Sequence, residues 1–483
     1  MAKSVAKNAV YNGIRTVCNM LFPLITYPYA ARVLMAENLG KVDFVTSVIS
    51  YFVLVAGLGI ATYATREGAA RRNDQDELNQ FSSEVFTINM VSTLISYALL
   101  AILLLAWPRL QGYMQLVALQ SLMIVGTTIG VEWVYSVQED YGYITLRSIV
   151  VQVISAALLF CLVKDSSDYV IYAGILVFSN VGANVFNFIR ARRYVRIRFV
   201  WHFDVMSHLV PMLVLFGNAV AVTIYVNIDI TLLNVYRGDY EVGIYSLAVK
   251  VYTILKSLLN SVTNVALPRL SLYRANDRQE EYQSLQDAIS HALIVVVLPV
   301  VALFILMADY VVMIVGGEGF ALSVGPLQML CIATIPAVFA CYVTNAILLP
   351  NNGERLLLKA TAAGAITNLV ANLVAIPAFG FMGAAFTTVL AEAVVLVYAS
   401  YLARPFCDWG YVLRSLVRPL ATALLCVVAM VLANAGIRQV TQFDIAGFFA
   451  TGFALTGAAI AMVFVCRDSL ALELVHKLGG RRS

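Results

Sequence analysis

Polar and ionisable side chains recur inside long apolar stretches of this sequence, at spacings that align them on single helical faces. In the first stretch these residues are Asn8, Asn12, Arg15, Asn19 and Thr26. A guanidinium flanked by amides offers charge-assisted hydrogen bonds, which are strongest where water is restricted. The row on this predicted helix is therefore expected to border a polar cavity.

A second concentration of polar groups lies on two apolar segments that the turn 237–241 joins. The segment before the turn carries Asn218, Tyr225, Asp229 and Tyr236, and the segment after it carries Ser246, Lys250, Thr253, Ser257, Asn260, Ser261 and Asn264. Both segments are long enough to cross a bilayer, so Asp229 and Lys250 are predicted to lie at membrane depth. An ionisable group there is costly unless it faces a bundle interior or a water-filled cavity. The pattern therefore predicts a membrane protein with a polar cavity.

The overall composition agrees with a chain that crosses the membrane many times. Of the 483 residues, 61% are hydrophobic and 12% are charged, whereas a soluble protein carries about 25% charged residues. The mean hydropathy is +0.82, and the apolar residues are spread from end to end, which excludes a soluble enzyme with a single anchor. The seven cysteines stand singly in or beside apolar runs, so no metal or redox site is predicted.

At roughly 20 residues per span, the chain is predicted to be an all-α integral membrane protein with about 14 transmembrane helices. The predicted spans are 9–34, 41–65, 81–106, 113–136, 143–163, 169–190, 207–235, 241–267, 286–307, 323–348, 355–376, 381–402, 413–433 and 444–465. The first of them is not a cleavable signal, because amides and Arg15 interrupt its apolar run.

Lysine and arginine are distributed unevenly between the two sets of connections. One side holds most of them, including the basic run 190–198. The other side holds only Lys41, Arg109, Lys164, Arg237 and Arg438. The positive-inside rule therefore predicts that both termini are cytoplasmic, and an even number of helices agrees with this. The basic run is interpreted as an interfacial anchor, with a site for anionic lipid headgroups as the alternative.

A weak internal repeat predicts two lobes. The stretch 32–44 resembles 234–245, with Gly40 and Gly243 in corresponding positions. Both copies begin on the same side, which predicts a parallel pseudo-twofold repeat about an axis along the membrane normal. We expect an N-terminal lobe at 1–200 with helices 1–6, a C-terminal lobe at 201–403 with helices 7–12, and two additional helices with a cytoplasmic tail at 404–483.

Five motifs then follow one another between residues 8 and 400. They are 28–34 with 37–40, 57–67, 132–135 with 138–139, 225–229 with 242–246, and 365–372 with 376–377 and 383–385. Together they resemble the polysaccharide-biosynthesis flippases, of the O-antigen and capsule type, in the multidrug/oligosaccharidyl-lipid/polysaccharide exporter superfamily. The resemblance implies a transporter of the bacterial plasma membrane, not an enzyme. Its cargo would be an undecaprenyl-diphosphate-linked oligosaccharide, carried from the cytoplasmic to the outer leaflet by alternating access.

The resemblance also implies partners and a central polar cavity. The partners would be membrane lipids, the polyprenyl-diphosphate-linked oligosaccharide itself, and a glycan polymerase with other assembly proteins. Because basic groups suit a diphosphate, Arg15 and Lys250 are the first candidates for the headgroup site. The remaining candidates are Asn12, Asn19, Arg32, Arg66, Arg147 and Lys256.

Five of the six basic candidates also have an ordinary structural interpretation. Arg15 can snorkel to the interface, and Lys250 can form an ion pair with Asp229. Arg32 and Arg66 can serve as interfacial anchors, and Lys256 can pack against a neighbouring helix.

Three acidic residues at membrane depth are candidates for ion coupling. They are Asp229, Glu132 and Glu392. A membrane-buried carboxylate that binds H⁺ or Na⁺ can bias the exchange between inward-open and outward-open states. The alternative is a carboxylate held by an ion pair or by hydrogen bonds between helices, and this interpretation is preferred for Glu392. No other cofactor is expected.

Two other classes of function are alternatives to a lipid-linked oligosaccharide flippase. A multidrug or lipid II exporter of the same superfamily is the nearer alternative, although a drug exporter would be expected to have a more acidic or aromatic cavity. A membrane glycan polymerase or ligase is the further one, and the short outer connection at 308–322 argues against it. Nucleic-acid binding has no support, because the arginines are distributed over one membrane side.

Overall fold

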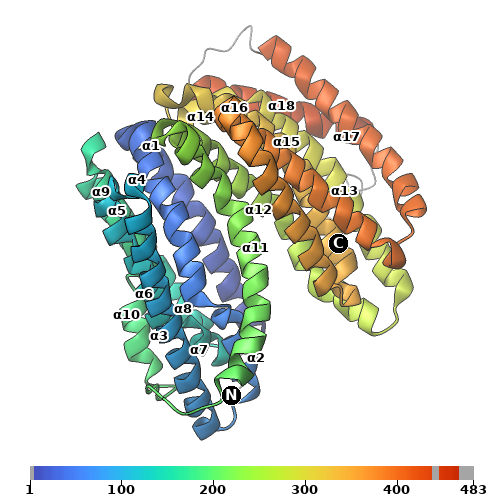
Figure 1. Cartoon of the computed structure of the whole chain (residues 1–483). Coiled ribbons are helices and arrows are strands. Elements are labelled where there is room, and N and C mark those ends of the chain that lie inside the picture. The colour runs from blue at the N-terminus through green and yellow to red at the C-terminus, as the bar shows by residue number, and fades with distance from the viewer. Residues whose placement is uncertain (1–4, 438–444, 467–483) are drawn as a thin grey trace. The chain divides into compact units, whose positions relative to one another are not determined.

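The computed structural model describes residues 5–437 and 445–466, and every regular element among them is helical. Figure 1 shows the helices in chain order. The α-helices are α1 (Val5–Gly57), α2 (Ile60–Ala70), α3 (Gln75–Ala106), α4 (Pro108–Gln111), α5 (Met114–Gln120), α6 (Leu122–Gly130), α7 (Glu132–Val137), α8 (Tyr141–Leu162), α9 (Tyr169–Val181), α10 (Asn184–Ala191), α11 (Val205–Arg237), α12 (Asp239–Ala275), α13 (Gln279–Leu306), α14 (Ala308–Val315), α15 (Val324–Tyr342), α16 (Glu354–Leu402), α17 (Trp409–Ile437) and α18 (Ile445–Val465).

Twelve helical stretches in the described residues are long and apolar enough to cross a membrane. Two of these stretches each cover two predicted helices, because the chain is kinked at Met35 (φ 64°) in α1 and at Gly380 (φ 58°) in α16. A straight helix with the 49 residues of α16 would be about 74 Å long, more than twice the roughly 30 Å of a hydrocarbon core. The all-α membrane fold is confirmed, and the count of 14 spans stays a prediction.

The chain forms two compact units, Met1–Gly243 and Ile244–Ser483. The boundary falls inside α12, so the first unit contains α1 to α11 and the first residues of α12. Within this unit α11 packs along α1, although the predicted boundary at residue 200 assigned that helix to the second lobe. The three-part division of the chain and its pseudo-twofold repeat stay predictions.

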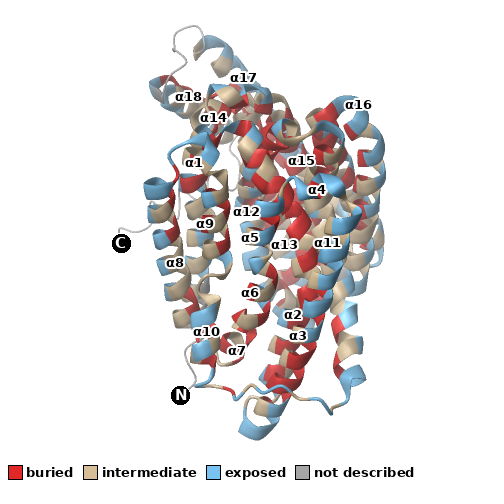
Figure 2. Ribbon diagram, turned by 60° about the vertical axis from the view of Figure 1, so that its left-hand side comes forward, coloured by how far each residue is buried: buried red, intermediate tan, exposed pale blue. Residues whose placement is uncertain are grey.

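One core cluster of the first unit lies where α2 and α3 pack with α7. Tyr63, Phe81, Trp133 and Tyr135 are its largest buried side chains, and each is at most 8% exposed. Figure 2 shows buried residues along α2 and α3. Aromatic rings here meet edge to face, as between Phe81 and Trp133, whose centroids are 6.0 Å apart. This rigid end of the unit holds α7, and α7 carries one of the predicted site residues.

In the second unit α16 packs against α15, and α13 packs against both α15 and α17. A smaller cluster of Ala302, Met307, Met430 and Leu455 joins α13, α17 and α18. On α16, Asn372 is buried and donates a hydrogen bond to Asn368, 3.0 Å away, and it also accepts one from Thr387. These amides and hydroxyls hydrogen-bond to one another, because lipid tails offer no hydrogen-bond partners.

Two glycines allow α1 and the start of α12 to touch along their backbones. A Cβ atom on Gly40 would overlap the carbonyl oxygen of Asp239, and a Cβ on Gly243 would overlap the carbonyl oxygen of Ala36. The contact is reciprocal, since each glycine faces the carbonyl four residues before the other. These are the two glycines that the sequence repeat aligns, and small residues are what such a close crossing requires.

Candidate functional site

Three predicted residues from three helices of the first unit meet at one carboxylate. Arg15 of α1 places Nη2 2.6 Å from Oε1 of Glu132, and Arg147 of α8 places Nη2 3.7 Å from Oε2. The side chains are 28%, 39% and 14% exposed for Arg15, Glu132 and Arg147. One carboxylate is thus shared between two guanidinium groups, and we call these residues the Arg15–Glu132–Arg147 cluster.

The position of Glu132 depends on a break between two short helices. Val131 separates α6 from α7 and has a left-handed backbone with φ 34°. A β-branched residue in this region is strained, and it persists only where surrounding packing enforces it. The break makes Glu132 the first residue of α7, whose far side is buried against α2. Hydrogen bonds also tie α8 to α1, from Gln152 Nε2 to Asn19 Oδ1 at 2.5 Å and from Thr145 to the Tyr11 carbonyl at 3.0 Å.

The cluster has one more positive charge than negative charge. Within the described residues, the Nε atoms of Arg15 and Arg147 are buried and make no hydrogen bond. A buried N–H without a partner is costly, and a guanidinium presents its donors in a planar fork that matches a phosphate. The arrangement can therefore accept an anionic group that competes with Glu132 for the two arginines. The Asn19 amide lies on the same helical face as Arg15 and is exposed.

Glu132 also lines a pocket of about 510 Å³ inside the first unit, and most of the lining surface is apolar. Hydroxyl and amide groups dominate the polar part of its lining, among them Thr46, Ser50, Asn89, Thr127, Thr128, Asn180 and Asn184. Such neutral oxygens can solvate a small cation or a protonated carboxyl group. Glu132 consequently pairs with two arginines and also borders this pocket.

Other predicted residues of this unit lie apart from the cluster. Arg32 is exposed and makes interactions of its own, and it follows Arg15 by 17 residues, roughly 25 Å along a helix. Arg66 is exposed on α2, with Nε 3.3 Å from Oε1 of Glu67. Asp229 is buried on α11 and has interaction partners. The side chain of Asn12 lies outside the described residues.

In the second unit, Lys256 of α12 forms an ion pair with Glu392 of α16. Tyr252 donates a second hydrogen bond to Glu392, 2.7 Å from its Oε1, and the Lys256 ammonium lies 5.5 Å from the centroid of the Tyr252 ring. Glu392 is 4% exposed. Glu392 is thus held by both an ion pair and a hydrogen bond between helices, and its role in ion coupling stays a prediction. Lys250 is exposed on α12 and makes interactions of its own.

Sequence reasoning missed a buried hydrogen-bonded triad in the first unit. His208 of α11 places Nε2 2.9 Å from Oε2 of Glu84 and Nδ1 2.8 Å from the hydroxyl of Tyr63. All three side chains are buried, and Gln80 donates to the second oxygen of Glu84 at 2.9 Å. The triad ties α2, α3 and α11 together. Glu84 and His208 could have been noticed in the sequence as ionisable residues near the ends of apolar stretches. Their positions in the sequence do not indicate that they bind each other.

No group of three or more histidine, cysteine or acidic side chains among the described residues is arranged to hold a metal ion.

Comparison with known proteins gives a family and several relatives. The family described as "Polysaccharide biosynthesis protein" matches residues 5–274. A protein of Shigella dysenteriae assigned as an O-antigen transporter is 22% identical over 385 residues, which cover 79% of this chain and 95% of that protein. A protein of Escherichia coli strain K12 with the same assignment is 24% identical over 271 residues, or 56% of this chain and 65% of that one.

Among solved structures, the lipid II flippase MurJ in an inward closed conformation is similar in fold. The TM-score is 0.76 at 13% sequence identity, and the match covers 96% of this chain and 100% of that one. At this identity the likeness concerns the fold alone. It extends through the described helices of both units, beyond the region that the family match covers.

Proposed function

The chain belongs to the polysaccharide biosynthesis protein family, and we propose that it is a flippase for lipid-linked oligosaccharides. The cargo would be a polyprenyl-diphosphate-linked oligosaccharide, moved from the cytoplasmic to the outer leaflet of a bacterial plasma membrane. The O-antigen transporter assignments of the two relatives support this choice of cargo. The excess of lysine and arginine on one side of the predicted membrane supports cytoplasmic termini.

One observation carries the assignment of a headgroup site: two arginines share a single carboxylate at Glu132. The cargo has a diphosphate, a polar glycan and a long apolar tail. The tail can remain in lipid, but the diphosphate must exchange its water shell for protein donors. In this proposal the diphosphate displaces the carboxylate of Glu132 from Arg15 and Arg147. The ion pairs of Glu132 with Arg15 and Arg147 form again when the cargo leaves, so the two arginines always have an anionic partner.

Replacing Arg15 with alanine is expected to slow translocation of the lipid-linked glycan by at least about tenfold, because one charge-assisted contact is worth about 1.5–3 kcal/mol. Arg147→Ala should act in the same direction, and Arg15→Lys should retain part of the rate because it keeps the charge but not the fork. Lys250→Ala tests the second candidate. The measurement is the rate at which a fluorescent lipid-linked oligosaccharide moves from one leaflet of a proteoliposome membrane to the other.

The matched control is Arg278→Ala, which removes an exposed arginine whose partner is Glu281, 2.5 Å away on the same surface. This variant should translocate at the wild-type rate. Wild-type rates for Arg15→Ala, Arg147→Ala and Lys250→Ala together would rule out the headgroup site. Labelled lipid II serves as a second cargo in the same vesicles, and preferential movement of lipid II would replace the proposed substrate class.

We also propose that an ion gradient drives the cycle through Asp229 or Glu132. Burial of Asp229 on α11 supports this, since it keeps a carboxylate away from bulk water. Glu132 is more exposed, but it lines a pocket whose hydroxyl and amide oxygens can solvate a small cation. Asp229→Asn keeps the shape of the side chain and removes its charge. Translocation by this variant should lose its dependence on a H⁺ or Na⁺ gradient across the vesicle.

The control for the ion-coupling test is Asp204→Asn, at the exposed N-cap of the same helix. Asparagine caps a helix as well as aspartate does, so this variant should respond to the gradient as the wild type does. A gradient response that survives Asp229→Asn and Glu132→Gln alike would exclude both residues from coupling.

A further inference from the structure

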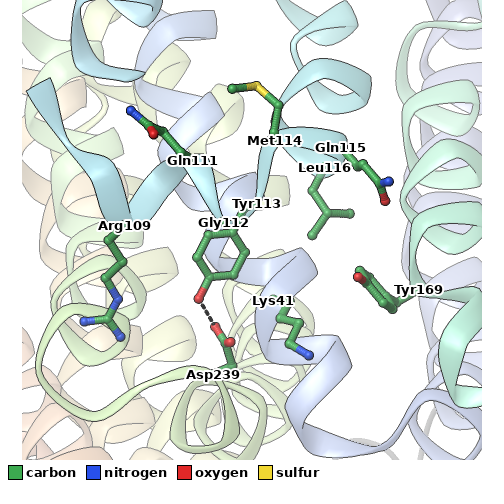
Figure 3. Close-up of a pocket in the computed structure, with 10 residues that line it drawn as sticks. All are labelled: Lys41, Arg109, Gln111, Gly112, Tyr113, Met114, Gln115, Leu116, Tyr169 and Asp239. Atoms are coloured by element: carbon green, nitrogen blue, oxygen red, sulfur yellow. Dashed lines mark hydrogen bonds between the residues drawn. The ribbon is translucent and has the colours of Figure 1, made fainter. Parts of the chain in front are cut away.

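A second pocket lies in the first unit, away from the Arg15–Glu132–Arg147 cluster, with a volume of about 570 Å³. Figure 3 shows the side chains around it, which come from α1, α4, α5, α9 and the first residue of α12. We call it the α4–α5 pocket. Several of its lining residues, within 109–116, come directly after the C-terminal end of α3. This helix has 32 residues and is therefore about 48 Å long. The pocket thus lies at the opposite end of this unit from the arginines that precede α3.

Hydrogen bonds hold one wall of the α4–α5 pocket in place. Tyr113 donates to Oδ1 of Asp239 at 2.8 Å, and Asn234 donates to the same oxygen at 2.6 Å. Arg109 uses two terminal nitrogens to bind the carbonyls of Asn234 and Val235, each at 2.8 Å, at the end of α11. Burial, together with the neighbouring Asp239, raises the pKa of Tyr113, so its phenol is a neutral donor at ordinary pH. This wall needs no rearrangement before it meets a ligand.

The other lining residues also carry polar groups, and two amides among them keep hydrogen-bonding capacity. Gln115 is exposed and makes no hydrogen bond to the described residues. Gln111 uses its nitrogen to bind the Leu104 carbonyl at 3.0 Å, which leaves its amide oxygen as an acceptor. Lys41 lies with its ammonium 5.5 Å from the centroid of the Tyr169 ring, and it is already paired with Glu37 at 3.3 Å and donates to Asn38 at 3.1 Å. In Figure 3, Lys41, Gln115 and Tyr169 come together on one side of the pocket.

This lining suits a saccharide better than a diphosphate or a lipid tail. A sugar ring offers hydroxyls that both donate and accept, and apolar C–H faces that pack on an aromatic ring. Amides, a carboxylate and a phenol provide the complementary donors and acceptors. The negative charge of Asp239 would repel a diphosphate. The two terminal nitrogens of Arg109 are already hydrogen-bonded to carbonyl groups of α11. The volume falls within the roughly 300–1,000 Å³ of small-molecule sites.

We propose that the α4–α5 pocket binds sugar residues of the lipid-linked glycan, at the end of the first unit opposite its arginine-rich connections. The assignment rests on the proposed function and adds a place where the glycan itself is recognised. Gln115 and Tyr169 are the residues that contact the sugar, by hydrogen bonding and by ring packing. Asp239 and Tyr113 shape the wall. Because Asp239 is the first residue of α12, occupancy of the pocket acts directly on the turn between α11 and α12.

The test measures glycan binding without translocation. Detergent-purified full-length protein is applied to an array of bacterial oligosaccharides, and the affinity for the best binder is then measured in solution. Gln115→Ala and Tyr169→Ala should each weaken binding by about tenfold, which corresponds to about 1.4 kcal/mol. Tyr169→Phe keeps the ring and should bind nearly as the wild type does. The matched control, Tyr236→Ala, removes an exposed tyrosine at the end of α11 that does not line the pocket, and should leave affinity unchanged.

Three results would overturn the assignment: no oligosaccharide bound by folded wild-type protein, equal affinities for all the variants, or displacement of the glycan by inorganic diphosphate. Melting temperatures of the variants show whether each is folded. The same preparations, placed in proteoliposomes, separate the two proposals. Glycan binding that depends on Gln115 and Tyr169, without any translocation, supports the pocket and contradicts the flippase. Translocation at the wild-type rate in both variants, with no glycan bound, supports the flippase and contradicts the sugar-binding pocket.

Discussion

Replacing Glu392 with alanine is expected to lower the free energy of unfolding by about 2–3 kcal/mol. The change removes the carboxylate that Lys256 and Tyr252 share, and it leaves an ammonium group inside an apolar helix pair. Breaking a fully buried ion pair in this way costs about 3–5 kcal/mol. We expect less here because the Lys256 side chain keeps 28% of its surface exposed. The measurement is unfolding of the purified protein in mixed detergent micelles.

A double variant distinguishes structural pairing from ion coupling at Glu392. Lys256→Met combined with Glu392→Ala removes both charges, so it should be more stable than Glu392→Ala alone. The control is Glu318→Ala, which changes an exposed acid in the same unit and should stay within about 0.5 kcal/mol of the wild type. A double variant that is less stable than the single one would contradict the ion pair as a structural element. Retained gradient dependence in the double variant would exclude Glu392 from coupling.

Replacing Gly243 with valine is expected to prevent the first unit from folding as it does here. Any Cβ at this position overlaps the Ala36 carbonyl oxygen, and backbone atoms cannot move aside as a flexible side chain can. Overpacking in a core lowers the free energy of unfolding by about 1–3 kcal/mol. We expect a clash with backbone atoms to cost about 3 kcal/mol or more. Gly40→Val should have the same effect, because its Cβ meets the Asp239 carbonyl. The measurement is the fraction of monodisperse protein after extraction in detergent, together with its melting temperature.

The matched control for the glycine pair is Gly217→Ala on α11, where a Cβ meets nothing within 4 Å. Alanine is a better helix former than glycine, by about 1 kcal/mol, so this variant should be as stable as the wild type or more stable. Normal yield and melting temperature for Gly243→Val would show that α1 and α12 do not need to approach this closely. Because Asp239 belongs to the same crossing, partial variants such as Gly243→Ala should also weaken glycan binding in the α4–α5 pocket.

Several features of this protein follow from its sequence alone. Long apolar runs interrupted at turns determine where helices form, because a backbone in lipid must satisfy its own hydrogen bonds. The spacing of Arg15 and Asn19 places them on one face, since that depends only on helical geometry within one segment. The order of the five motifs was sufficient to identify the family. The alignment of Gly40 with Gly243 singled out the two positions that a close crossing needs.

Only the tertiary structure decided which of these residues meet. Periodicity places Glu132 on a helical face, but it does not say that Arg15 and Arg147 share its carboxylate. It could not pair Lys256 with Glu392, join His208 to Glu84, or close the α4–α5 pocket around Gln115. The physical reason is that local geometry fixes a face within one helix, whereas partners are chosen when separate helices pack. That choice depends on crossing positions, kinks such as Met35 and Gly380, and breaks such as Val131, which side-chain patterns do not encode.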